Sequence, residues 1–244
     1  MTRIRCVLLA CILMVGCGDN AETASTNKTD TTGEPAPVTN GSPRPGLDAS
    51  RRLAPGSVAT PTTILVLGDS ISAAYGIQRD QGWVALLDTE VKRLGGEHRV
   101  VNASISGETT GGGLARLQRA LEEQRPDLVI VELGGNDGLR GYPVERIEQN
   151  LRRIIEQCQE AGAAVILVGM QIPPNYGPRY AQGFAGLFAT LASDYQVPLV
   201  DAFLEEIALA GNLMQSDGIH PTAAAQPILL RAIWDPVAEF LQRR

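Results

Sequence analysis

Residues 63–70 read Thr-Ile-Leu-Val-Leu-Gly-Asp-Ser, and this stretch decides the fold. It begins as a short, continuous apolar run and ends at Gly68, followed directly by Asp69 and Ser70. A run of this length without polar alternation is typical of a strand buried on both faces, as in a parallel sheet. Ligands of such sheets bind beyond the carboxyl ends of the strands. Asp69 and Ser70 therefore come where a functional site is expected.

After this first strand, apolar runs alternate with amphipathic segments along the rest of the chain. A strand followed by a helix, repeated several times, predicts a parallel sheet that helices cover on both faces. Periodicity and the positions of Gly and Pro set the bounds of each element. The expected strands are 63–67, 98–101, 127–131, 164–168 and 198–200, and the expected helices are 83–94, 113–123, 144–161, 180–195 and 222–242.

The composition of the 244-residue chain excludes several classes of protein. Its 44% hydrophobic share is that of a globular protein and excludes a fully disordered, collagen-like or coiled-coil chain. The formal net charge is −6 and there is no basic stripe to neutralise phosphates, so we expect no nucleic-acid partner. His98 and His220 are the only two histidines, which argues against a multi-histidine metal site.

Residues 1–16 predict a bacterial lipoprotein signal peptide. Two arginines precede an apolar run of about eleven residues, which is shorter than the ~20 residues that span a bilayer. The segment Met14-Val15-Gly16-Cys17 resembles a lipobox, so Cys17 is the expected lipidation site. Cleavage by ordinary signal peptidase, or lipidation at Cys11, are the alternatives. Gly18 favours the outer membrane, which would put the protein in the cell envelope, on the periplasmic side.

Residues 17–60 are expected to be the lipidated cysteine and a disordered tether. They are rich in Thr, Ser, Pro and Gly and have too few large apolar side chains to offset chain entropy. Residues 61–244 are then one folded domain. Cys158 is the only thiol in that domain and is expected to be a small buried hydrophobe.

Four short polar clusters contain the candidate functional residues. Three follow the first three predicted strands, and the fourth precedes the last predicted helix. Since the carboxyl ends of parallel strands share one edge of a sheet, all four can converge on one crevice. The clusters are Gly68-Asp69-Ser70, Ser104-Ile105-Ser106-Gly107, Gly134-Gly135-Asn136-Asp137 and Asp217-Gly218-Ile219-His220-Pro221.

Each cluster taken alone has an ordinary structural interpretation. Gly-Asp-Ser is a common turn, and Gly-Gly-Asn-Asp can end a strand. The run Gly111-Gly112-Gly113 lacks the residues of a phosphate-binding loop and is expected to be a flexible entry to the second helix. The joint order of the four clusters, and their position after strands, favours a functional interpretation.

Ser70 is the candidate nucleophile, and a serine needs a base to attack at neutral pH. His220 is the candidate base, because Asp217 lies three residues before it with a glycine between them, so that a turn can fold the carboxylate onto the imidazole. His98 is expected to face solvent instead. Backbone N–H groups of Ser70 and Gly107 and the side-chain amide of Asn136 can stabilise an oxyanion.

Together these blocks resemble the SGNH (GDSL-type) hydrolases, in their thioesterase I, lysophospholipase L1 and arylesterase branch. The resemblance covers about residues 62–242. It implies the α/β class, as a flavodoxin-like three-layer α/β/α sandwich with a parallel five-stranded sheet. Supporting runs are Asn102-Ala-Ser-Ile-Ser-Gly107, Val131-Glu-Leu-Gly-Gly-Asn-Asp-Gly-Leu-Arg-Gly141 and Pro174-Asn-Tyr-Gly177.

By the same resemblance Ser70 is the nucleophile, Asp217 and His220 complete a catalytic triad, and Gly107 and Asn136 join Ser70 in the oxyanion hole. Ile71 and Ala74 stand where the family commonly has Leu and Gly, a departure expected to affect pocket shape alone. Ile71, Ile172, Pro174 and Tyr176 are expected to line an acyl pocket, and an ordinary Pro-rich loop over 171–180 is the alternative.

The resemblance implies a serine esterase that hydrolyses small acyl esters, thioesters or lysophospholipids through an acyl-enzyme on Ser70. We expect the protein to be a monomer. It needs no metal and no organic cofactor. The other predicted partner is a membrane, to which the N-terminal lipid would anchor the protein. Two further functions stay open: a carbohydrate O-deacetylase of the same family, and a non-catalytic lipoprotein that binds lipid or glycan.

Overall fold

The computed structural model describes residues 61–243 except Gly96, Ala202 and Leu209. The predicted signal peptide (1–16), Cys17 and the predicted tether up to residue 60 lie outside the described residues. Within the described part, no helix combines the length and the hydropathy needed to cross a bilayer.

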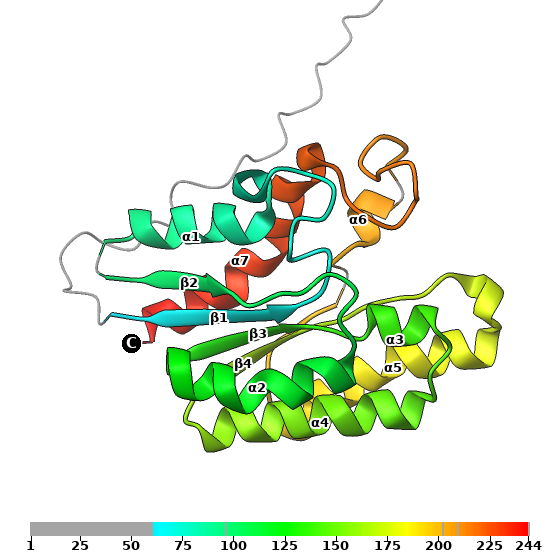
Figure 1. Ribbon diagram of the computed structural model, residues 1–244, viewed down its shortest axis with the longest axis horizontal. Helices are drawn as coiled ribbons and strands as arrows, with labels where there is room; N and C mark the ends of the chain where they lie inside the picture. The colour runs from blue at the N-terminus through cyan, green and yellow to red at the C-terminus, as the bar shows by residue number, and fades with distance from the viewer. Residues whose placement is uncertain (1–60, 96, 202, 209, 244) are drawn as a thin grey trace, which may run out of the picture. The chain divides into compact units, whose positions relative to one another are not determined.

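A parallel five-stranded sheet forms the centre of the fold, as predicted (Figure 1). Its strand order is β2-β1-β3-β4-β5. β2 therefore lies on one side of β1, and β3, β4 and β5 follow in turn on the other side. The order reverses between β1 and β3, and ligands of doubly wound sheets bind at such a switch point. The strands are β1 (Thr63–Gly68), β2 (Arg99–Asn102), β3 (Leu128–Glu132), β4 (Ala164–Val168) and β5 (Leu199–Val200).

Long helices cover both faces of the sheet and complete the three predicted layers (Figure 1). Alternate side chains of β1 pack toward opposite faces, because successive residues of a strand point to opposite sides. Ile64 and Val66 join the hydrophobic cluster of α1 and α7, whereas Leu65 and Leu67 join that of α2, α4 and α5. These helices are α1 (Trp83–Arg93), α2 (Thr110–Gln124), α4 (Val144–Glu160), α5 (Pro178–Tyr195) and α7 (Gln226–Gln242).

Several short helices were not predicted, because each is too short to show a helical period. The most consequential is α3, which follows β3 and contains Asn136. In Figure 1, α3 and α6 both lie toward the carboxyl ends of the strands. The short elements are α3 (Gly135–Leu139), α6 (Glu205–Ala208) and the 3₁₀ turns η2 (Arg79–Gln81) and η3 (Pro174–Tyr176). A further 3₁₀ turn, η4 (Ala223–Ala225), takes the place of the first turn of the helix predicted over 222–242.

The expected flexible entry at residues 111–113 is instead the first turn of α2. The Thr109 hydroxyl oxygen accepts a hydrogen bond from the Gly112 N–H at 3.2 Å, which caps the helix three residues earlier than predicted. Gly113 then packs closely on the core, since a Cβ there would lie 2.4 Å from Cδ1 of Leu133. Gly113 therefore lets α2 lie close to the sheet.

The prediction that His98 faces solvent is wrong, since its side chain is only 6% exposed. His98 lies two residues before Val100, and residues i and i+2 of an extended chain share a face. Val100 packs against the cluster of α1 and α7, so His98 turns inward with it. Burial lowers the pKa of His98. Cys158, in contrast, is a buried free thiol as predicted, and burial raises its pKa to about 12.

Candidate active site

Ser70 lies in a tight turn directly after β1, at the carboxyl end of the strand. Asp69 opens this turn, because its Oδ1 accepts the Ile71 N–H at 3.0 Å and its carbonyl accepts the Ala73 N–H at 2.9 Å. The Ser70 carbonyl accepts the Tyr75 N–H at 3.0 Å and closes the turn. The side chain of Ser70 is thereby held at the edge of the sheet where ligands of this architecture bind.

Ala74 adopts a left-handed backbone conformation, with φ of 59°. Glycine is the residue that takes this conformation without steric cost. The departure from glycine at this position was expected to affect pocket shape alone, but the structure shows that it also bears on the backbone of the turn that carries Ser70.

The structure brings Ser70 together with His220 and Asp217, which are far from it in sequence. Nε2 of His220 lies 2.9 Å from Oγ of Ser70. Nδ1 of the same ring lies 2.7 Å from Oδ2 of Asp217. A hydroxyl, an imidazole and a carboxylate are thus connected in one line of hydrogen bonds, which is the geometry that activates a serine.

A tight loop fixes the relation of Asp217 to His220. Oδ1 of Asp217 accepts the backbone N–H groups of Ile219 at 2.9 Å and of His220 at 3.0 Å. The glycine between them, Gly218, takes a φ of 69° that completes the turn. Hydrogen bonds from the His220 backbone and ring hold the pKa of Asp217 well below its usual range, so this carboxylate stays charged at neutral pH.

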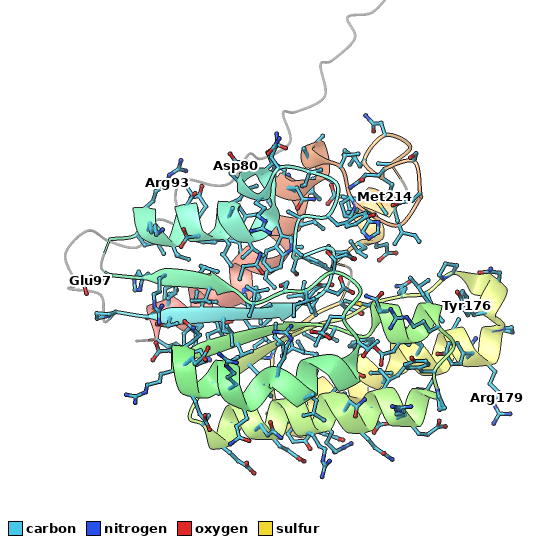
Figure 2. The ribbon with its side chains drawn as sticks, viewed as in Figure 1. Asp80, Arg93, Glu97, Tyr176, Arg179 and Met214 are labelled. Atoms are coloured by element: carbon cyan, nitrogen blue, oxygen red, sulfur yellow. The ribbon has the colours of Figure 1, made fainter. Side chains whose placement is uncertain are left out.

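Neighbouring segments hold this loop against the turn of residues 69–75 that carries Ser70, the candidate nucleophile; this turn is called the nucleophile turn below. The Gln215 N–H donates to the His220 carbonyl at 2.7 Å, and Met214 and Pro221 form an antiparallel bridge. The Tyr75 ring packs on the His220 ring, with centroids 4.4 Å apart. Figure 2 shows Met214 and Tyr176 toward the carboxyl ends of the strands, and Arg93 and Glu97 toward the opposite end. Met214, which pairs with Pro221, thus lies at the edge of the sheet where the sequence predicted the site.

The two other predicted oxyanion residues, Gly107 and Asn136, follow β2 and β3. Gly107 takes a φ of 80°, and its carbonyl accepts from Nη2 of Arg140 at 3.1 Å. Asn136 lies in α3, and its Nδ2 donates to Oδ2 of Asp69 at 2.9 Å. That bond uses one of the two amide hydrogens of Asn136, which leaves the other for a ligand.

Sequence reasoning assigned no individual role to Asp69, Asp137 or Tyr75. Asp69 joins the nucleophile turn to Asn136, as described above. Asp137 is buried and accepts the Thr110 N–H at 2.8 Å and the Thr110 hydroxyl at 2.7 Å, which anchors α3 to the start of α2. The two aspartates lie within the quoted motifs, so the signal was present, but the motifs do not say which atoms they contact.

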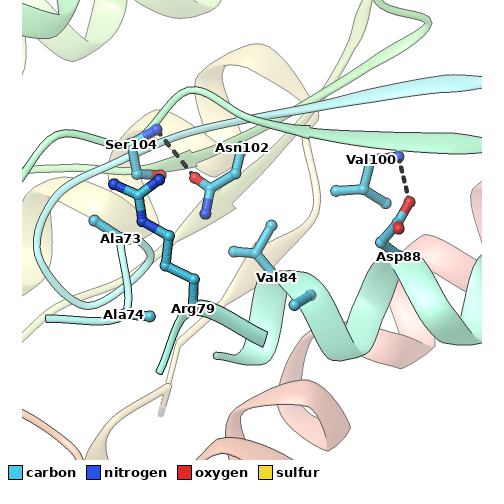
Figure 3. Close-up of a pocket in the computed structure, with 9 residues that line it drawn as sticks. Ala73, Ala74, Arg79, Val84, Asp88, Val100, Asn102 and Ser104 are labelled. Atoms are coloured by element: carbon cyan, nitrogen blue, oxygen red, sulfur yellow. Dashed lines mark hydrogen bonds between the residues drawn. The ribbon is translucent and has the colours of Figure 1, made fainter. Parts of the chain in front are cut away.

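A cavity of about 320 Å³ lies between the turn that carries Ser70, α1 and β2 (Figure 3). Arg79 points into it, and Ser104 and Asn102 border it. The Ser104 N–H donates to Oδ1 of Asn102 at 3.0 Å, while Nδ2 of Asn102 donates to the Ser72 carbonyl at 2.8 Å. Asn102 therefore supports the nucleophile turn from the side of β2.

Three of the predicted acyl-pocket residues, Ile71, Ile172 and Tyr176, do not line that cavity. Ile71 is buried in the cluster of α1 and α7, and Ile172 in the cluster on the opposite face of the sheet. Tyr176 is exposed, and its hydroxyl donates to the Leu139 carbonyl at 2.7 Å. The fourth, Pro174, begins the 3₁₀ turn η3. The role of all four as walls of one acyl pocket stays a prediction.

Residues 66–227 match the model of the GDSL-like lipase/acylhydrolase family, which is more than half of the chain. The chain belongs to this family. The membership confirms both the predicted family and the predicted class of ester-bond hydrolase.

Individual members of the GDSL-like family agree with this membership. Esterase TesA of Pseudomonas aeruginosa is 49% identical over 183 residues, which are 75% of this chain and 91% of that protein. The Escherichia coli protein named thioesterase 1/protease 1/lysophospholipase L1 is 44% identical over 171 residues, which are 70% of this chain and 81% of that protein. The crystal structure of esterase EstA from Pseudoalteromonas sp. has a TM-score of 0.71 and 43% identity, over 74% of this chain and 99% of that chain.

Proposed function

We propose that this chain is a serine esterase whose nucleophile is Ser70, whose general base is His220 and whose orienting carboxylate is Asp217. The observation that carries the proposal is the unbroken line of hydrogen bonds, 2.9 Å from Ser70 to His220 and 2.7 Å from His220 to Asp217. A serine hydroxyl within hydrogen-bond reach of an imidazole, itself oriented by a carboxylate, is the arrangement of an activated nucleophile.

The first half of the proposed reaction forms an acyl-enzyme. Oγ of Ser70 attacks the carbonyl carbon of the ester while Nε2 of His220 takes the hydroxyl proton. The charged carboxylate of Asp217 stabilises the imidazolium that results. When the tetrahedral intermediate collapses, the bond to the leaving group breaks, and the same proton passes from His220 to the departing alcohol or thiol.

The second half repeats these steps with water. His220 takes a proton from water as the water oxygen attacks the acyl carbon, and then returns it to Oγ of Ser70 as the free acid leaves. Both tetrahedral intermediates carry a negative oxygen, for which we assign as donors the amides of Ser70 and Gly107 and the free side-chain N–H of Asn136. One such donor contributes about 2.7–4 kcal/mol to the transition state in comparable hydrolases.

The proposed substrates are small carboxylic esters, with thioesters and lysophospholipids as further members of the class. The names of the relatives support this range, since they include an esterase, an arylesterase and a thioesterase/lysophospholipase. No observation specific to this chain favours acetylated carbohydrate, so O-deacetylation enters as an outcome of the test.

The function is tested by covalent labelling and by a substrate panel on the folded domain. A fluorophosphonate is expected to phosphonylate Ser70, which mass spectrometry of the peptide that contains Ser70 would show as one added group. The related EstA structure is described as inhibited by monoethylphosphonate, which supports this choice of probe. The panel contains p-nitrophenyl acetate and octanoate, a thioester, a lysophospholipid and an acetylated sugar. The two p-nitrophenyl esters are expected to be hydrolysed, and prior labelling should abolish both activities.

Two outcomes would contradict the proposal. The absence of both an adduct and any hydrolysis would favour a non-catalytic binding protein. Turnover confined to acetylated sugar, with octanoate untouched, would favour the carbohydrate deacetylase. The rates of hydrolysis of the thioester and the lysophospholipid then show which leaving group the protein prefers.

We further propose that the protein is held to a membrane on the periplasmic side of the cell envelope through lipid on Cys17. The support is the run Met14-Val15-Gly16-Cys17 after an apolar segment with an arginine-containing start. Two or more acyl chains give stable anchoring, because each buried CH₂ contributes about 0.8 kcal/mol. The full chain expressed in a Gram-negative cell is expected to enter the detergent phase of a Triton X-114 extract, and Cys17→Ser to remain aqueous. Equal partitioning of the two would contradict the anchor.

A further inference from the structure

A second carboxyl group, that of Glu132, is buried beneath the nucleophile turn. Glu132 is the last residue of β3 and is 0% exposed. It pairs in register with Gly68, the last residue of β1. A Cβ on Gly68 would lie 2.7 Å from Oε2 of Glu132, so the glycine makes room for this carboxyl group. The carboxyl therefore fills the space directly under the Gly68-Asp69-Ser70 segment.

One oxygen of Glu132 holds both sides of the turn that carries Ser70. Its Oε2 accepts the backbone N–H of Asp69 at 3.2 Å and the hydroxyl of Ser72 at 2.6 Å. Asp69 and Ser72 lie just before and two residues after Ser70 in the chain. A displacement of this oxygen would therefore loosen the turn on both sides of the nucleophile.

The same contact leads on to the proposed oxyanion hole. Asp69, whose amide Glu132 holds, accepts Nδ2 of Asn136 on its own Oδ2 at 2.9 Å. That bond fixes the plane of the Asn136 amide and so directs its remaining N–H. Glu132 thus holds the backbone N–H of Asp69, directly before Ser70. Through Asp69 it also supports the carboxylate that orients the Asn136 amide.

The surroundings of the two neighbouring carboxyl groups, those of Glu132 and Asp69, favour a proton on Glu132. Its Oε1 is buried and has no hydrogen-bond partner among the described residues, and an unpaired buried charge is costly. Burial first, and then the nearby charge of Asp69, raise the pKa of Glu132 well above its usual value. Burial raises the pKa of Asp69 to about 6, which still leaves Asp69 mostly charged at neutral pH. The two oxygens of the Asp69 carboxylate each accept a hydrogen bond, from the Ile71 N–H and from Nδ2 of Asn136, so the negative charge is better stabilised on Asp69 than on Glu132.

We propose that Glu132, as an uncharged carboxylic acid, is a positioning residue that sets the nucleophile turn and, through Asp69, the orientation of Asn136. It does not touch substrate or the reacting atoms. The proposal rests on the proposed function of Ser70 and deepens it. It explains why a fully buried acidic side chain stands at the end of a strand that is otherwise apolar.

The test compares Glu132→Gln with Glu132→Ala in the folded protein. Gln keeps the volume, the neutral charge and an oxygen acceptor for Asp69 and Ser72, whereas Ala removes the acceptor. Glu132→Ala is expected to lower kcat for p-nitrophenyl esters by about 10- to 100-fold with KM little changed, since misplacement of about 1 Å costs this much. Glu132→Gln is expected to restore kcat to within about threefold of the parent.

Three further measurements separate positioning from loss of folding and test the uncharged form. Rates are divided by the number of active sites that a fluorophosphonate titrates, so an unfolded fraction does not count. Ser72→Ala removes one partner of Oε2 without a large cavity and is expected to lower kcat by a smaller factor in the same direction. The infrared spectrum of the parent at neutral pH should contain a C=O stretch of a protonated carboxylic acid that Glu132→Gln lacks.

Each result has one meaning. Parental kcat per titrated site in Glu132→Ala would overturn the positioning role. A loss in Glu132→Gln as large as that in Glu132→Ala, or an infrared spectrum without the acid band, would overturn the uncharged form. If the parent itself is neither labelled nor active, it is the proposed function of Ser70 that fails.

Discussion

Replacing Ser70 with alanine is expected to lower kcat for p-nitrophenyl esters by about 10⁵- to 10⁶-fold, as removal of the nucleophile does in other serine hydrolases. The substitution removes only Oγ, which lies 2.9 Å from Nε2 of His220. The backbone turn is held by Asp69 and Glu132 and keeps its hydrogen bonds, so substrate affinity and thermal stability should stay near parental. Steady-state kinetics with each ester, and a thermal melt, measure these effects.

Ser193→Ala is the matched control, because Ser193 lies exposed on α5. It makes the same chemical change outside the candidate site and should leave kcat as it was. Hydrolysis by Ser70→Ala at more than about a hundredth of the parental rate would show that another group attacks the ester, since nucleophile removal costs far more than that.

Asp217→Asn is expected to lower kcat by about 10³-fold, with the protein folded. The amide group of Asn places a donor against Nδ1 of His220 and stabilises the wrong tautomer of the ring. The corresponding loss in a triad with a deeply buried aspartate is about 10⁴. We expect less here because the side chain of Asp217 is 39% exposed and water screens its charge.

The double variant tests whether Asp217 acts through Ser70. Groups that act as one unit show losses that do not add, so Asp217→Asn should cost nothing further in a Ser70→Ala background. Asp80→Asn, at an exposed carboxylate of η2, is the control for the change in charge. A loss below about tenfold in the single Asp217→Asn variant would remove Asp217 from the triad.

The sheet was predictable from the sequence because its strands are buried on both faces and therefore read as continuous apolar runs. The run Leu128–Glu132 shows why such prediction stops short. Its first four residues indicate a buried strand, and the final Glu is fully buried as well, although an acidic residue ordinarily ends a strand at solvent. Only the packing of Gly68 and Ser72 around its carboxyl group shows where it lies.

The candidate triad was predictable for a different reason. Asp217 and His220 are close in sequence, and the rule that sites lie after parallel strands added Ser70 and Asn136. The links between these residues were not predictable, because they depend on tertiary contacts. The bond from Asn136 to Asp69 spans 67 residues, and the packing of Tyr75 on His220 brings together two loops with no shared pattern. The inward turn of His98 was missed because a polar residue in a charged run looks like surface.

In the proposed mechanism the acid–base unit is the loop from Asp217 to His220, so it is encoded almost wholly in four consecutive residues. Its internal bonds run from carboxylate to backbone and from carboxylate to ring, so they do not depend on the sheet. The position of Ser70, in contrast, depends on the pairing of β1 with β3, which places Glu132 beside Gly68. Substitutions around this loop can therefore move it, to suit a different leaving group, without altering the hydrogen bonds between Asp217 and His220.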